Sequence, residues 1–146
     1  MHPQLEYAAS VWDPYTEINK KKIEMVQRRA ARYVNNDYQP TSSVSNMLQN
    51  LGWPSLQDRR KVRRLVLFFK IHNGLAAIDT NRYLKPMNRE SRHTHEMSYK
   101  VPPSKTDYHM YSFFPRTIRA WNSLSLPLIE TKYVEYFKTN IEELYF

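Results

Sequence analysis

Residues 56–73 read LQDRRKVRRLVLFFKIHN, and they predict a helix that is basic at its start and apolar on all sides along its second half. Ser55 is a favourable N-cap, and Asp58, three residues further on, approximates a capping box. Gly74 is expected to end the helix, since glycine readily adopts the left-handed conformation of a helix C-terminus. One face repeats at spacings of three and four residues and is expected to enter the core: Val62, Leu65, Val66 and Phe69.

A second basic helix is predicted over residues 17–35, and the polar run 35–37 ends it. Its expected buried stripe consists of Ile23, Val26, Ala30 and either Tyr33 or Val34. Lys21, Arg28 and Arg32 lie at positions i, i+7 and i+11, so they are expected on the opposite face.

The fold class that these patterns predict is all-α. We expect five or six helices in a small bundle, with one long irregular loop at about 86–112 that holds a short strand near 99–101. Residues 17–73 would be the basic helical part and 114–146 the C-terminal helices. Residues 1–146 are the length of one domain, and the apolar start of the chain suggests a fragment of a longer polyprotein.

The positive charge of the chain is concentrated in residues 17–73. This segment holds twelve of the 22 lysines and arginines against four acids, which accounts for the whole formal net charge of +8. Such a localised charge favours an anionic partner, for example a phosphate backbone. The candidate nucleic-acid-binding residues are Lys21, Arg28, Arg29, Arg32, Arg59, Arg60, Lys61, Arg63 and Arg64.

Other interpretations of this charge stay open. The basic side chains could form a solvated helix face, or they could pair with acidic residues of a neighbouring domain or protein partner. Tyr33, Tyr38 and Trp53 flank the basic helices and could stack on bases, although positions in an apolar stripe or a turn favour packing within the protein. No pattern here predicts recognition of particular bases.

No catalytic residue, cofactor or metal site is predicted. The chain has no cysteine, and its His93-x-His95 pair near Glu96 and His109 is a weak metal signal. It has no Asp-Asp pair for two-metal catalysis, and its adjacent acids Glu142 and Glu143 fall in an amphipathic helix. No apolar run approaches the roughly 20 residues of a membrane-spanning helix, and no signal peptide is recognisable, so we expect an intracellular protein, cytoplasmic or nuclear, without a membrane partner.

Five segments resemble one known family, in the same order and over nearly the whole chain. The family is the polymerase polyprotein of non-LTR (LINE-type, jockey-like) retrotransposons, in the region downstream of the reverse-transcriptase palm. The segments are HPQLEYAASVWDP (2–14), VQRRAARYV (26–34), LGWPSLQDRR (51–60), FKIHNGL (69–75) and FFPRTIRAWNSL (113–124).

This resemblance implies the thumb and C-terminal helical extension of a reverse transcriptase. The family's catalytic aspartates lie upstream, in a Tyr/Phe-Ala-Asp-Asp turn that is absent here. The endonuclease, and the cysteine-histidine knuckle of some relatives, are absent as well. The implied function is non-catalytic binding of RNA template or RNA–DNA duplex, with the parent protein's palm as a further partner. The alternatives are a protein interaction module and a decayed retroelement fragment without a present role.

Overall fold

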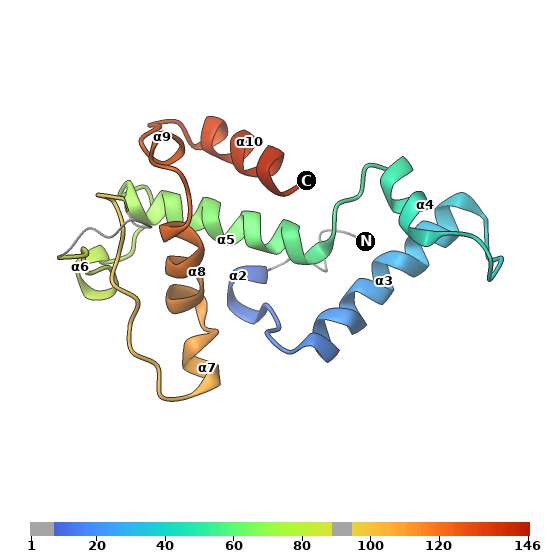
Figure 1. Ribbon diagram of the computed structural model, residues 1–146, viewed down its shortest axis with the longest axis horizontal. Helices are drawn as coiled ribbons and strands as arrows, with labels where there is room; N and C mark the ends of the chain where they lie inside the picture. The colour runs from blue at the N-terminus through green and yellow to red at the C-terminus, as the bar shows by residue number, and fades with distance from the viewer. Residues whose placement is uncertain (1–7, 89–94) are drawn as a thin grey trace. The chain divides into compact units, whose positions relative to one another are not determined.

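The computed structural model describes residues 8–88 and 95–146. Within these two stretches the chain forms nine α-helices and no β-strand, which confirms the all-α prediction (Figure 1). Five of the helices have at least seven residues. The helices are α2 (Ala9–Trp12), α3 (Glu17–Asn35), α4 (Val44–Asn50), α5 (Leu56–His72), α6 (Thr80–Tyr83), α7 (Asp107–Met110), α8 (Phe113–Asn122), α9 (Leu126–Ile129) and α10 (Val134–Tyr145).

Contacts along the chain divide it into two compact units. Met1–Lys61 with Phe146 form the first unit, and Val62–Tyr145 form the second. The organisation of residues 1–146 as a single domain stays a prediction. Each unit has its own buried cluster, and each is described by itself below.

In the first unit, the buried side of α3 is shifted from the stripe that the apolar pattern predicted. Its buried residues are Gln27 and Ala31, the predicted Ile23, Val26 and Ala30 are half-buried, and Tyr33 and Val34 are exposed. The buried Gln27 is stabilised by a tertiary hydrogen bond, because its side-chain amide donates to the carbonyl oxygen of Pro54 at 3.0 Å. A sequence pattern that counts apolar residues alone does not predict the burial of a glutamine.

The short helix α4 completes this small core. Ser43 is its N-cap and accepts the backbone N–H of Asn46 at 3.4 Å. Val44 and Met47 are buried against Ala31, with Trp53 packed beside them. The chain then turns at Gly52, whose φ of 61° is in the left-handed region that favours glycine.

The second unit is built around aromatic rings from α5, α8 and α10. Phe69 of α5 is fully buried and stacks on Phe137, with ring centroids 4.2 Å apart and planes at 18°. Phe68 is equally buried, and its ring centroid lies 4.9 Å from that of Trp121. The core face predicted from the sequence did not include Phe68. Val66 is half-buried at the edge of this cluster.

The long loop before α8 is irregular but anchored. Asn122 binds the backbone of Tyr99 in both directions, accepting its N–H at 3.0 Å and donating to its carbonyl at 2.8 Å. The Nε1–H of Trp121 donates to the carbonyl of Met97 at 3.0 Å. In place of the expected strand, an isolated β-bridge joins Pro86 and Tyr99, and α7 forms near the end of the loop.

The C-terminal region, predicted to be helical over 114–146, divides into α8, α9 and α10. Pro127 lies in the first turn of α9, where a residue without a backbone N–H is tolerated. The last helix begins at Val134. Of the helices in the described stretches, none combines the length and the apolar character that crossing a membrane requires.

Candidate nucleic-acid interface

The solvent side of α3 carries a row of exposed residues that we call the α3 face: Ile18, Lys22, Met25, Arg29 and Tyr33. Their spacings of four, three, four and four residues place them in one stripe along the helix. Lys21 is also exposed and borders this stripe. The row combines cations with exposed apolar and aromatic side chains, and the opposite side of the helix holds the buried Gln27 and Ala31.

Four of the predicted site residues lie on α3, and the structure separates them. Lys21 and Arg29 are exposed, while Arg28 is half-buried. Burial raises the pKa of Glu24, and the charge of Arg28 is one of the weaker influences that oppose this rise. Arg32 is half-buried and turns towards the chain that follows α3. Lys22 was not among the predicted residues, although its position seven residues before Arg29 placed the two on one helix face.

Arg32 fixes the loop between α3 and α4. Its guanidinium donates to the backbone carbonyl oxygens of Gln39 at 2.9 Å, Asp37 at 3.3 Å and Ser42 at 3.5 Å. The backbone N–H of Asp37 in turn donates to the carbonyl of Arg32 at 3.1 Å. The side chain of Arg32 therefore has a structural role in this loop.

The same loop holds Tyr38 on its surface. Asn36 adopts a left-handed conformation with φ of 48°, and the Asp37 carboxylate accepts the Gln39 N–H at 3.0 Å. The hydroxyl of Ser42 and the N–H of Gln39 hold the pKa of Asp37 below its usual value. These hydrogen bonds hold the residues on either side of Tyr38, and Tyr38 itself is 62% exposed.

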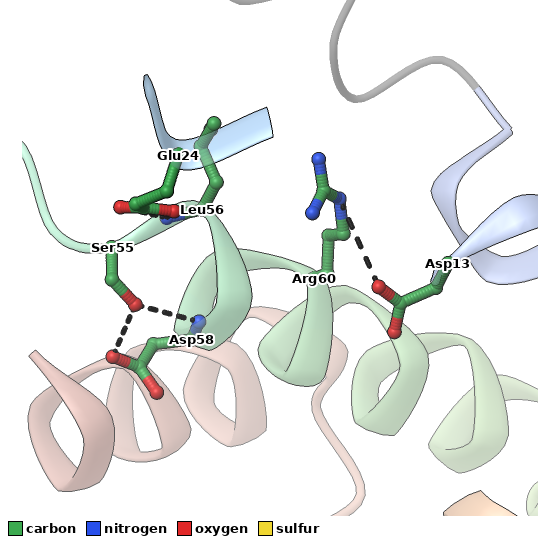
Figure 2. A network of polar contacts seen from close by, with 6 residues as sticks. All are labelled: Asp13, Glu24, Ser55, Leu56, Asp58 and Arg60. Carbon is green, nitrogen blue, oxygen red and sulfur yellow. Dashed lines mark hydrogen bonds and ion pairs between the residues drawn. The ribbon is translucent and has the colours of Figure 1, made fainter. Parts of the chain in front are cut away.

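In the first unit, Arg60 of α5 is buried. It has only 1% of its surface exposed, and its Nε lies 3.9 Å from the Asp13 carboxylate (Figure 2). Its guanidinium also lies 5.1 Å from the ring centre of Trp12. These contacts with the end of α2 and the residue after it place Arg60 inside the unit. Arg59 and Lys61 are half-buried.

In the second unit, Arg64 is buried as well. Its burial, together with the positive charge of Arg116, lowers the pKa of Arg64 to about 9. Arg63 is exposed. Of the five candidate residues on α5, the structure therefore leaves Arg63 as the one that is well exposed, because Arg60 and Arg64 lie inside their units.

Each of the four acids of the basic segment has a polar partner within the first unit. Glu17 forms an ion pair with Lys20 at 2.7 Å, and Asp37 binds the loop. Asp58 and Ser55 form the predicted capping interaction: the Ser55 hydroxyl accepts the Asp58 N–H at 3.0 Å and donates to its carboxylate at 2.6 Å (Figure 2). Glu24 accepts the backbone N–H of Leu56 at 3.2 Å.

The consequence for the α3 face is electrostatic. Among residues 8–88 and 95–146, no carboxylate forms an ion pair with Lys21, Lys22 or Arg29. Lys22 and Arg29 therefore keep their charge available to an anionic ligand. The charge of Lys21 is also exposed, although after Lys20 it helps to lower the pKa of Glu17.

The structure describes one member of the His93-x-His95 pair, which was a weak metal signal in the sequence. His93 lies outside the described residues, and the Nε2 of His95 is 3.3 Å from the carbonyl oxygen of Trp121. Across the described part of the chain, no three His, Cys, Asp or Glu side chains gather into a group that could hold a metal ion.

Comparisons of this chain with protein-family models, with curated proteins and with solved structures find no match. The geometry and charge of the α3 face are therefore the basis on which a function can be argued.

Proposed function

We propose that this chain is a non-catalytic nucleic-acid-binding module that corresponds to the thumb and C-terminal region of a non-LTR retrotransposon reverse transcriptase. The cations of the α3 face, together with the bordering Lys21, would hold RNA template or RNA–DNA duplex by its phosphates. The observation that carries this proposal is the row of Lys21, Lys22 and Arg29, exposed on one helix while the nearby acids bind other groups.

Binding of this kind is driven by the release of counterions from the phosphate backbone. An arginine can donate two hydrogen bonds to one phosphate, whereas the lysines act as flexible point charges. Arg63 and the half-buried Arg28 could add contacts at the margins of their helices. The buried Arg60 and Arg64 take no direct part in this proposal, and Arg32 supports the loop.

The five segments that resemble the retrotransposon polyprotein add the biological context of the proposal. In that context the upstream palm of the parent protein supplies polymerase chemistry, and this chain supplies part of the grip on the template. The proposed contacts are to phosphates, so we expect little dependence on base sequence.

The test is the salt dependence of binding to an RNA–DNA duplex. The triple variant Lys21→Ala/Lys22→Ala/Arg29→Ala should bind more weakly and reduce the slope of log K against log salt by about 2 to 3, the loss of three phosphate contacts. The matched control is Lys105→Ala/Lys132→Ala/Lys138→Ala, which removes the same charge from exposed positions outside the basic segment.

The control variant should retain most of the affinity and slope of the wild type. Equal losses in the two variants would show that only overall charge matters, and an unchanged slope in the α3 variant would refute the proposed interface. Helix content by circular dichroism would verify that both variants are folded.

A second candidate function is a protein interaction module, and the exposed apolar residues of the α3 face favour it. Ile18 is 69% exposed and Met25 is 47% exposed, between the cations of the same stripe. An acidic partner with an apolar patch would fit this pattern. In that case, duplex binding by the wild type would be weak and nearly insensitive to the α3 substitutions.

A further inference from the structure

We propose that Tyr33 and Tyr38 form a stacking platform for the bases of an unpaired strand. This inference rests on the proposed nucleic-acid-binding function and deepens it, because it names single-stranded nucleic acid as a ligand of the α3 face. The sequence favoured packing positions for both tyrosines, and the structure shows that this interpretation was wrong: Tyr33 is 77% exposed and Tyr38 is 62% exposed. Trp53, the third aromatic residue considered, does pack beside the Ala31 cluster.

The two rings lie on a supported part of the chain. Tyr33 is in the last turns of α3, and Tyr38 lies in the loop that Arg32 binds through three backbone carbonyls. The left-handed Asn36 between them donates its backbone N–H to the carbonyl of Tyr33 at 3.2 Å. A platform that is already ordered loses less conformational entropy when a ligand binds.

Cations lie beside the platform on the same stripe. Arg29 precedes Tyr33 by four residues, so the two side chains are neighbours on the surface of α3. Lys22 follows the same face seven residues before Arg29. Non-specific single-strand binding uses this combination: basic residues follow the backbone while aromatic rings stack on successive bases.

An unpaired strand fits this surface better than a duplex. In a duplex each base is already stacked on its neighbours, so exposed rings on a convex helix and loop can reach little more than backbone and groove. In a single strand the base faces are accessible to aromatic side chains. Cations alone would bind both ligands, and the tyrosines would add affinity for the single strand alone.

The decisive comparison uses three probes with the full-length chain: a single-stranded oligonucleotide of about twelve nucleotides, an abasic strand of the same length, and a duplex of the same length. The abasic strand keeps the phosphates and removes the bases. We expect the wild type to bind the single strand at least about five-fold more tightly than the abasic strand, since stacking on one ring contributes at least that factor.

Substitution of the tyrosines should remove this preference. Tyr33→Ala/Tyr38→Ala should weaken single-strand binding about five-fold or more, and it should leave abasic and duplex binding and the salt slope unchanged. Tyr33→Phe/Tyr38→Phe keeps the rings and should bind as the wild type does. Because both side chains are exposed, neither variant should lose helix content.

Several outcomes would overturn the stacking platform while the proposed function survives. These are equal wild-type affinity for the single and abasic strands, full single-strand affinity in the alanine variant, and a loss in the phenylalanine variant equal to that in the alanine variant. Equal competition by polyglutamate of matched charge would show that the surface recognises acidic protein. If none of the three probes binds in a salt-dependent manner, the proposed function itself fails.

Discussion

The carboxylate of Glu24, in the middle of α3, accepts the backbone N–H of Leu56, the first residue of α5, with its two oxygens at 3.3 Å and 3.2 Å (Figure 2). The first N–H groups of a helix have no partner within the helix, so one of them is satisfied here by a side chain from another helix. Burial raises the pKa of Glu24, while the Leu56 N–H and the charge of Arg60 act in the opposite direction. Glu24 therefore joins the two basic helices at the start of α5.

Removal of this cap should destabilise the first unit. We expect Glu24→Ala to lower the free energy of unfolding by about 0.5–2 kcal/mol, the usual effect of losing a helix N-terminal cap. Glu24→Gln keeps an oxygen that can accept the Leu56 N–H and should lose less. Urea unfolding of both variants checks this, with Glu17→Ala as a control at an exposed carboxylate of the same helix; equal stabilities of wild type and Glu24→Ala would contradict it.

The pH dependence of the same residue has a defined sign. Because the folded state raises the pKa of Glu24, the native protein holds this proton more tightly than the unfolded chain. The stability that Glu24 contributes is thus fully present below its ordinary pKa, and it is lost as the pH rises through the raised value. Glu24→Gln cannot titrate, so its stability relative to the wild type should increase across that pH interval; a constant difference would refute the shift.

The stack of Phe69 on Phe137 makes Phe69 a sensitive position of the second unit. Phe69→Ala should lower the free energy of unfolding by about 3–5 kcal/mol, because the site is fully buried and a cavity would remain. A loss of that size could abolish cooperative unfolding in a chain of this length. The same substitution at Phe146, which is 55% exposed, serves as the control, and a loss at Phe69 below about 1 kcal/mol would contradict the assigned burial.

Arg32 should act through the loop and not through its charge alone. Arg32→Lys keeps the positive charge but cannot reproduce the planar fork that reaches three carbonyls, so we expect a loss of about 1 kcal/mol in stability. Hydrogen exchange at the amides of Gln39 and Ser42 should accelerate, whereas Arg29→Lys should leave it unchanged. Unaltered exchange in Arg32→Lys would show that the backbone holds the loop without the side chain.

The purified chain should incorporate no nucleotides on a primed RNA template with Mg²⁺ or Mn²⁺. Two-metal catalysis requires clustered carboxylates, and the five aspartates are dispersed among local contacts. Asp13 lies by Arg60, Asp58 caps α5, and Asp79 accepts the N–H of Asn81 at 3.1 Å, while Asp37 binds its loop and Asp107 begins α7. Primer extension that an Asp→Asn change abolished at one position would overturn both this expectation and the assignment to a region after the palm.

The helices that the sequence predicted best are those with local start and stop signals. The bounds of α3 agree with the predicted 17–35, and α5 begins at the Ser55–Asp58 cap and is followed by Gly74 with φ of 69°. Capping groups act within a few residues, so a single sequence contains the information that they need. The helices α7 and α9 have four residues each, which is too short for a periodic pattern to develop.

The candidate site was predictable in its charge but not in the orientation of its residues. Arg60 is buried because Trp12 and Asp13, nearly fifty residues earlier in the chain, meet its guanidinium. Arg32 turns away from solvent because the loop after α3 presents carbonyl oxygens to it. Both arrangements depend on tertiary contacts. From a run of charged residues alone, every member would be predicted to lie on the surface.

The placement of the three tryptophans gives each unit its own optical signal. Trp12 is 41% exposed and Trp53 is half-buried in the first unit, whereas Trp121 is completely buried among aromatic rings in the second. Trp121 should therefore emit at shorter wavelength than the other two. Replacing Trp121 by Phe, or the other two by Phe, leaves one unit visible at a time in a fluorescence melt. Coincident transitions would show that the 146 residues unfold as one cooperative system, and separate transitions would assign a stability to each unit.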